Sequence, residues 1–162
     1  MTSLISDELN KLLCKQLINE KYNANLYLFI AGFLRNKGLD NLAKIFIEQN
    51  KEEESHSKMF FDILTDMNSD VDISLIPACN VQINTILDIS RIYLEREIMT
   101  TNEINTIKKF SIQDNNPVVE EFCRKMISLQ QKEYEEATNF QDKAILTGGD
   151  WKFIFLWDQG LG

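Results

Sequence analysis

Glu53 and His56 are the residues whose types and spacing point most directly to metal chemistry. They form a Glu-x-x-His pair, and residues three positions apart share one face of a helix, so both side chains can reach the same ion. His56 is the only histidine in the chain. One imidazole combined with carboxylates suits iron or manganese, whereas a structural zinc site normally contains thiolates. Alone, the pair is a weak signal, because such matches are common on helix surfaces.

Three other segments of the sequence each carry an acid in the middle of an apolar helical stripe. The acids are Glu20, Glu97 and Glu133, and Gln130 lies one turn before Glu133. In antiparallel helices of similar length the midpoints meet at one level, so these groups would converge with Glu53. Buried like charges are strongly unfavourable, and the stripes hold no Lys or Arg at that level. Two divalent cations are the simplest source of the missing positive charge.

Each of these residues also has an ordinary structural interpretation. A buried Gln or Tyr is more often a hydrogen-bonded core residue than a ligand. The charged run 51–54 is typical of a solvated helix face, so Glu52 and Glu54 are assigned to the surface by default. A scaffold bundle whose buried polar groups only fix the helix register is an alternative that needs no metal. Four acids and one histidine at a single level favour the metal site.

Long helices must position these residues, and the sequence predicts four of them followed by a short fifth. Only 6 Gly and 2 Pro occur, so long uninterrupted elements are expected. The apolar periodicity predicts helices over residues 7–36, 41–67, 85–111, 117–147 and 151–157. The expected N-terminal caps are Ser6, Asp40, Asn116 and Asp150, and the expected helix stops are Gly38 and the pair Gly148 and Gly149.

The lengths of the connections set the topology. Short turns after the first and third helices make each pair antiparallel. The linker over residues 68–84, which contains Pro77, can span the bundle, because an extended chain covers about 3.3 Å per residue. We therefore expect an all-α, ferritin-like four-helix bundle with one long crossover and a short C-terminal fifth helix, in a single domain over residues 1–162.

The composition of the whole chain excludes several functional classes. A formal net charge of -8 argues against nucleic acid as a partner. No basic leader begins the chain, and no apolar run approaches the roughly 20 residues of a membrane span. Three cysteines far apart in sequence indicate reduced thiols rather than a disulfide framework. A cytoplasmic protein without a membrane partner is expected.

At these residues the chain resembles the non-haem bacterial ferritins over nearly its full length. In that family a Glu and a Glu-x-x-His on the first two helices hold one iron of a pair, and Glu20, Glu53 and His56 match them. By the same resemblance Glu53 bridges the two irons. The second iron takes a Glu of the third helix, matched by Glu97, with a Gln of the fourth helix nearby, matched by Gln130.

Other positions match the family less completely. Tyr27 matches a family tyrosine that lies close to the di-iron centre. Glu52 and Glu133 match two acids of a third iron site, but Leu129 and Lys132 replace two others. The resemblance therefore implies a third site that is weakened or absent.

Four more positions bear on the chemistry around the pair. Lys125 replaces a family tryptophan that takes part in electron or radical handling, and Glu54 stands where a haem-binding relative carries methionine. No haem is therefore expected. Gln16 and Gln49 are expected to orient the ligands.

The resemblance implies an iron storage protein with ferroxidase activity. It would oxidise Fe(II) with O2 or H2O2 at the di-iron site and store the product as mineral in a homo-oligomeric, 24-subunit cage. The apolar tail either lies at a subunit junction or folds back on its own bundle; its large side chains are Phe153, Phe155, Leu156 and Trp157. A di-iron oxidase or peroxide scavenger that stores nothing is an alternative. The acidity of the chain disfavours a DNA-protecting miniferritin.

Overall fold

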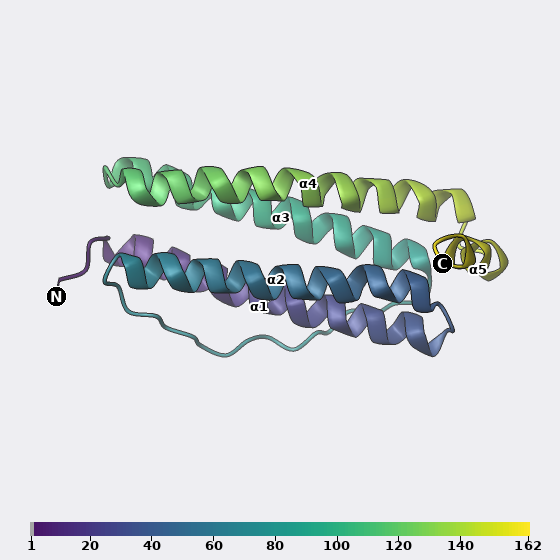
Figure 1. Ribbon diagram of the computed structural model, residues 1–162. Coiled ribbons are helices and arrows are strands. Elements are labelled where there is room, and N and C mark those ends of the chain that lie inside the picture. The colour runs from purple at the N-terminus through teal and green to yellow at the C-terminus, as the bar shows by residue number, and fades with distance from the viewer. Residues whose placement is uncertain (1) are drawn as a thin grey trace.

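The computed structural model describes residues 2–162 and contains five helices, with no strand in that range. The helices are α1 (Asp7–Asn36), α2 (Asp40–Asp66), α3 (Ile86–Gln113), α4 (Pro117–Thr147) and α5 (Trp151–Gly160). The first four lie lengthwise in a bundle, and α5 lies across one end (Figure 1). No helix in the described part of the chain is long and apolar enough to cross a membrane.

The connections follow the expected topology. The pairs α1–α2 and α3–α4 are antiparallel hairpins, and the segment between α2 and α3 runs as an extended strap along the outside of α1 and α2 (Figure 1). This crossover places the start of α3 beside the α1–α2 turn. All four long helices therefore present their middles to one another.

Side-chain caps begin most of the helices as predicted. The Ser6 side chain accepts a hydrogen bond from the Leu9 amide, and Asn116 and Asp150 cap α4 and α5 in the same way. Gly148 and Gly149 follow α4 with φ of 62° and 78°, a left-handed conformation that glycine adopts without strain. The fifth helix is longer than expected, because it continues past residue 157 to residue 160.

The predicted cap of α2 is wrong. Asp40 is the first helical residue, and the N-cap is Leu39, which offers no capping side chain. The acceptor comes instead from the far end of the chain: Oδ1 of Asp158, on α5, accepts a hydrogen bond of 2.7 Å from the Leu42 amide. Asp158 is 1% exposed, and its backbone oxygen also accepts a bond from Asn41. An acid distant in sequence thus takes the place of a local cap. A search of the residues just before the helix cannot find it.

Replacing this acid with alanine should loosen the C-terminal helix. We expect Asp158→Ala to lower the free energy of unfolding by about 1–2 kcal/mol, because the buried Leu42 amide loses its acceptor. Chemical denaturation followed by circular dichroism measures the change. Asp142→Ala, on the exposed face of α4, is the control and should change stability by less than about 0.5 kcal/mol. Equal effects of the two substitutions would contradict the cap.

Two apolar clusters fill the bundle, one on each side of its middle. The cluster at the N-terminal end includes Leu9, Leu13, Leu17, Phe60, Leu64, Ile104, Val119, Cys123 and Met126. The cluster at the α5 end includes Ile30, Leu34, Leu42, Phe46, Ile89, Tyr93, Phe140, Ala144 and Ile154. A layer of buried polar side chains separates them. The apolar packing thus holds four helices in register on both sides of that layer.

The apolar tail was expected either to fold back on its own bundle or to lie at a subunit junction, and one face of α5 fits the first arrangement. Ile154 is fully buried against the bundle, and the Trp157 ring lies 5.0 Å from the Phe140 ring, so one face of α5 folds back. Phe153, Phe155 and Leu156 are each more than half exposed. The opposite face of α5 is therefore apolar and points outward.

Candidate metal centre

The buried polar layer contains every acid that the sequence places in a helical stripe. Glu20, Glu53 and Glu97 are fully buried and come from α1, α2 and α3. Glu133 on α4 is 2% exposed and His56 on α2 is 5% exposed. Each lies at the middle of its helix because the stripes of apolar residues around it face the same core.

These side chains form two groups that share one residue. Oxygen and nitrogen atoms of Glu20, Glu53 and His56 lie within 4.8 Å of one another, and so do carboxylate oxygens of Glu53, Glu97 and Glu133. The His56 Nδ1 atom lies 3.6 Å from Oε2 of Glu53 and 3.9 Å from Oε2 of Glu20, and its Nε2 atom lies 3.3 Å from Oε1 of Glu133. Two adjacent ion positions with Glu53 between them fit this arrangement.

A second layer of hydrogen bonds orients the acids. Gln16 donates to Oε1 of Glu20 at 2.9 Å, and Gln130 donates to Oε2 of Glu97 at 2.8 Å. The Tyr27 hydroxyl donates to the other oxygen of Glu97. Both oxygens of Glu97 are thus fixed by neighbours on α1 and α4, which holds the carboxylate in one orientation.

Gln49 does not have the role expected of it. Its amide donates at 3.0 Å to Glu136, an acid one turn beyond the centre, rather than to one of the converging acids. The sequence analysis did not identify Asn23 and Thr100, which form a second buried polar contact close to the acids. Asn23 donates to Thr100 at 3.1 Å and accepts from Arg96 at 2.8 Å, which ties α1 to α3. Asn23 and Thr100 follow Glu20 and Glu97 by three residues, so helical spacing alone would have found them.

Burial and mutual repulsion favour protons on these carboxyl groups when no cation is bound. The pKa of Glu53 lies well above its ordinary value because of burial and the nearby Glu20. Burial, followed by Glu97, raises the pKa of Glu133 to about 10. Burial also raises the pKa of Glu97, although bonds from Tyr27 and Gln130 oppose that shift. Without a cation, these carboxyl groups are therefore more stable protonated than ionised.

Several polar atoms in the layer have no hydrogen-bond partner in the described part of the chain. They are Oε2 of Glu20, both carboxylate oxygens of Glu53, Nδ1 of His56, Oε1 of Gln130 and Oε2 of Glu133. Unpaired buried acceptors are costly, and native proteins rarely contain so many together. Hard oxygen donors and one imidazole are the ligands that iron and manganese prefer. The donor set therefore fits such ions.

The two acids beside Glu53 lie in different environments. Glu54 is exposed and pairs with Lys21 at 3.6 Å, as the surface interpretation predicts. Glu52 is only half-buried, and its carboxyl group adds to the burial and the nearby Glu97 that raise the pKa of Glu133. The default assignment of Glu52 to a solvated face is thus only partly right. Its carboxylate borders the buried layer.

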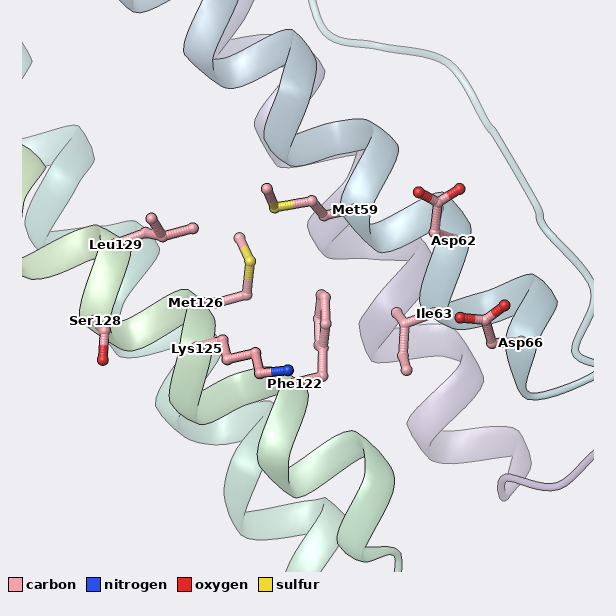
Figure 2. Close-up of a pocket in the computed structure, with 9 residues that line it drawn as sticks. All are labelled: Met59, Asp62, Ile63, Asp66, Phe122, Lys125, Met126, Ser128 and Leu129. Carbon is pink, nitrogen blue, oxygen red and sulfur yellow. The ribbon is translucent and has the colours of Figure 1, made fainter.

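Two of the α4 positions that were expected to differ from the family line a groove on the surface of the bundle. Leu129 and Lys125 line an apolar groove of about 550 Å³ between α2 and α4, together with Met59, Phe122 and Met126. Figure 2 shows Met59 on α2 and Met126 on α4 both directed into this space. Asp62, Asp66 and Ser128 line the groove as well, although its walls are mainly apolar. The expected weakening or loss of a third iron site stays a prediction.

The four long helices and their buried acids define the class of protein: a four-helix bundle with a carboxylate-rich centre. The sequence profile of the ferritin-like domain family matches residues 10–145, and the chain belongs to that family.

The chain is 26% identical to a probable bacterial non-heme ferritin-like protein of Haemophilus influenzae, over 98% of this chain and 96% of that one. It is also 26% identical to a bacterial non-heme ferritin of Campylobacter jejuni, over 96% and 93% of the two chains. The resemblance to bacterial non-haem ferritins is thereby confirmed.

The fold is also that of solved ferritins. An open pore ferritin from the archaeon Archaeoglobus fulgidus superposes with a TM-score of 0.91, covers 97% of both chains and is 23% identical in sequence. The expected architecture of a four-helix bundle with a short C-terminal helix is confirmed.

Proposed function

We propose that this protein oxidises Fe(II) at the buried carboxylate layer and stores the product as mineral inside an assembly of many subunits. The observation that carries the proposal is the pair of overlapping ligand groups that share Glu53. Within residues 2–162, the ion pairs of these acids involve only His56 and neither Lys nor Arg. Membership of the ferritin-like family supports it, as do relatives named non-heme ferritins.

The proposed roles follow the two groups. Glu20 and His56 hold one Fe(II), and Glu97 with Glu133 holds the other, while Glu53 bridges them. Gln130 has an unpaired Oε1 atom and can bind the second ion weakly through it. Tyr27 contacts the pair only through Glu97 and can supply a proton or an electron there. Glu52 borders the pair and stays outside it in this proposal. No haem is needed.

The carboxyl groups of the layer must also release protons when iron binds. Carboxyl groups with raised pKa values carry protons in the metal-free state, so incoming cations must displace them. Once ionised, the carboxylates favour Fe(III) over Fe(II), because hard anionic oxygens stabilise the higher charge. The oxidant is O2 or H2O2 in this proposal.

Storage requires a closed shell, for which the C-terminal helix supplies the main support. The outward face of α5 exposes three large apolar side chains, and Leu146 at the end of α4 is 85% exposed. Apolar surface of this kind is typical of contact between subunits. We propose a 24-subunit homo-oligomeric cage in the cytoplasm, by analogy with the resembling family. Three free cysteines agree with a reducing compartment.

One experiment separates the candidate functions. The purified protein is loaded aerobically with Fe(II) and passed over a sizing column with light scattering and iron analysis of the same peak. We expect one large species that carries many more irons per subunit than the two of the centre. Oxidation without retained iron would favour the oxidase or peroxide scavenger. A monomer or dimer that neither binds nor oxidises iron would leave only the structural bundle.

A further inference from the structure

A groove between α3 and α4 leads from the surface to a residue of the carboxylate layer. It has a volume of about 280 Å³, and Gln130 is the one fully buried residue among those that line it. The Nε2 atom of Gln130 donates to Oε2 of Glu97 at 2.8 Å. Gln130 therefore lies between this groove and Glu97, a proposed ligand of the second ion.

The exposure of the lining residues decreases from the mouth of the groove inward. Thr101 and Ile127 are half-buried, and Gln130 is fully buried. The mouth is formed by four exposed residues, which are Ile98, Asn102, Gln131 and Tyr134. The groove thus runs from the surface toward the centre of the bundle rather than along the helices.

The carboxylate layer itself is closed to solvent. Glu20, Glu53 and Glu97 are fully buried, and His56 and Glu133 are no more than 5% exposed. Any molecule that reacts with ions held by these residues must therefore pass a side chain that moves aside. A residue that both contacts the layer and lines a groove is placed to be that side chain.

Gln130 can move at little cost to the surrounding hydrogen bonds. Its Oε1 atom has no partner within residues 2–162, and both bonds of its Nε2 atom go to Glu97, at 2.8 Å to Oε2 and 3.4 Å to the backbone oxygen. That backbone oxygen also accepts a bond of 3.0 Å from the Thr101 hydroxyl. A glutamine side chain turns about three bonds, so Gln130 can swing away by releasing only Glu97.

The groove suits an uncharged molecule better than a cation. None of the seven residues that line it is charged. Uncharged walls do not repay the cost of taking a divalent ion out of water, whereas apolar walls with a few polar groups are typical of sites for small neutral molecules. The half-buried acids Glu52 and Glu136 do not line this groove. It therefore lacks the charge that would draw Fe(II) inward.

We propose that this groove admits the neutral oxidant to the second ion position, and that Gln130 swings aside to let it pass. The inference rests on the proposed function, because the oxidant is the O2 or H2O2 of that reaction. Both molecules are small and uncharged. Fe(II) reaches the layer along a different path, so the binding of the ions and the arrival of the oxidant are separable.

The test measures access to the centre with nitric oxide, a neutral diatomic molecule close to O2 in size. The assembled protein is loaded anaerobically with Fe(II), and nitric oxide binding is followed by stopped-flow absorbance and electron paramagnetic resonance. Ile98→Trp places an indole over the mouth, and Thr101→Phe narrows the groove farther in. We expect each substitution to slow nitric oxide binding by at least about tenfold, because the path then opens less often.

Met99→Trp is the matched control. Met99 is the next residue along α3 and is 44% exposed, against 42% for Ile98, but it does not line this groove. The control should bind nitric oxide at the rate of the parent protein. Anaerobic Fe(II) titration should give one affinity for the parent, both groove variants and the control, since none of them changes a proposed ligand.

The role of Gln130 is tested separately. Gln130→Ala removes the end of the side chain and should speed nitric oxide binding, while it weakens the binding of one Fe(II) and not the other. Mixing Ile98→Trp with O2 and with H2O2 in parallel then shows which oxidant uses the groove, because only the reaction with that oxidant becomes slower.

The outcomes separate the route from the underlying function. If nitric oxide binds equally fast in the parent, Ile98→Trp and Thr101→Phe, the route is wrong and the metal centre stands. An equal delay in Met99→Trp, or Fe(II) uptake that slows together with nitric oxide binding, also overturns the route. An unchanged rate in Gln130→Ala contradicts the gate. If the parent protein binds no Fe(II), both proposals fail. Should one groove variant fold poorly by circular dichroism, the other decides.

Discussion

Glu53→Gln should nearly abolish Fe(II) oxidation and at the same time make the metal-free protein more stable. Glu53 is the one residue common to both ligand groups, so its loss weakens both ion positions. Mutating outer-shell partners of metal sites typically costs about 10- to 100-fold, and a shared ligand should cost more. Stopped-flow mixing of Fe(II)-loaded protein with O2 measures the rate.

The gain in stability has a separate physical cause. At pH 7 the carboxyl group of the unfolded chain is ionised, so folding must bury its charge or take up a proton. The pKa of Glu53 lies well above its ordinary value in the folded protein, and a Gln side chain avoids both costs. We expect the free energy of unfolding without metal to rise by at least about 1 kcal/mol.

A neighbouring substitution provides the control. Glu54→Gln makes the same chemical change one residue away, on the exposed side of α2, and should alter neither the oxidation rate nor the stability by a measurable amount. Retention of full oxidation in Glu53→Gln would remove that residue from the centre. A loss of apo stability would show that the carboxylate is structurally required.

The second large effect is an inverted dependence of stability on pH. Glu53, Glu97 and Glu133 have raised pKa values, so the folded state binds more protons than the unfolded chain above the ordinary value of 4.5. Their favourable contribution is complete below that pH and disappears as the pH rises through the folded values, about 10 for Glu133. Within the window each carboxyl lowers the free energy of unfolding by about 1.4 kcal/mol per pH unit.

Thermal unfolding of the chelator-treated protein between pH 5 and 9 tests this dependence. We expect the midpoint to fall steadily with rising pH, and to fall less in Glu53→Gln, which subtracts the general effect of the net negative charge. Added Mn2+, which does not require an oxidant, should restore stability most at high pH, because the ligands are then ready to ionise. A flat or rising midpoint without metal would contradict the protonated layer.

Much of the fold was predictable because its signals are local and repeated. The apolar periodicity placed the four long helices within about two residues of their ends. The acids expected in those stripes, Glu20, Glu53, Glu97 and Glu133, are all buried. The length of the linker over residues 68–84 indicated the crossover, because an extended chain of that length can span the bundle. The cap of α2 could not be predicted in this way. Its acceptor, Asp158, follows Leu42 by more than a hundred residues and depends on where α5 docks.

The candidate centre was predictable from register but not from contact. Spacing alone puts Glu20, Glu53 and Glu97 at one level, and the structure brings them together. Whether a neighbouring polar side chain contacts one of these acids depends on its exact direction from the helix axis and on its rotamer. Apolar periodicity does not resolve either. Gln16 therefore contacts Glu20 as expected, whereas Gln49 contacts Glu136. The metal-binding roles themselves remain predictions.

The position of the acid layer between two separate apolar clusters has a consequence for how the subunit works in cycles. Neither cluster shares a buried apolar residue with the other, and neither depends on an ion. The cost of an empty centre is therefore confined to the middle of the bundle, while both ends keep their packing. If the layer binds iron as proposed, we expect ions to bind and leave repeatedly without the protein having to refold.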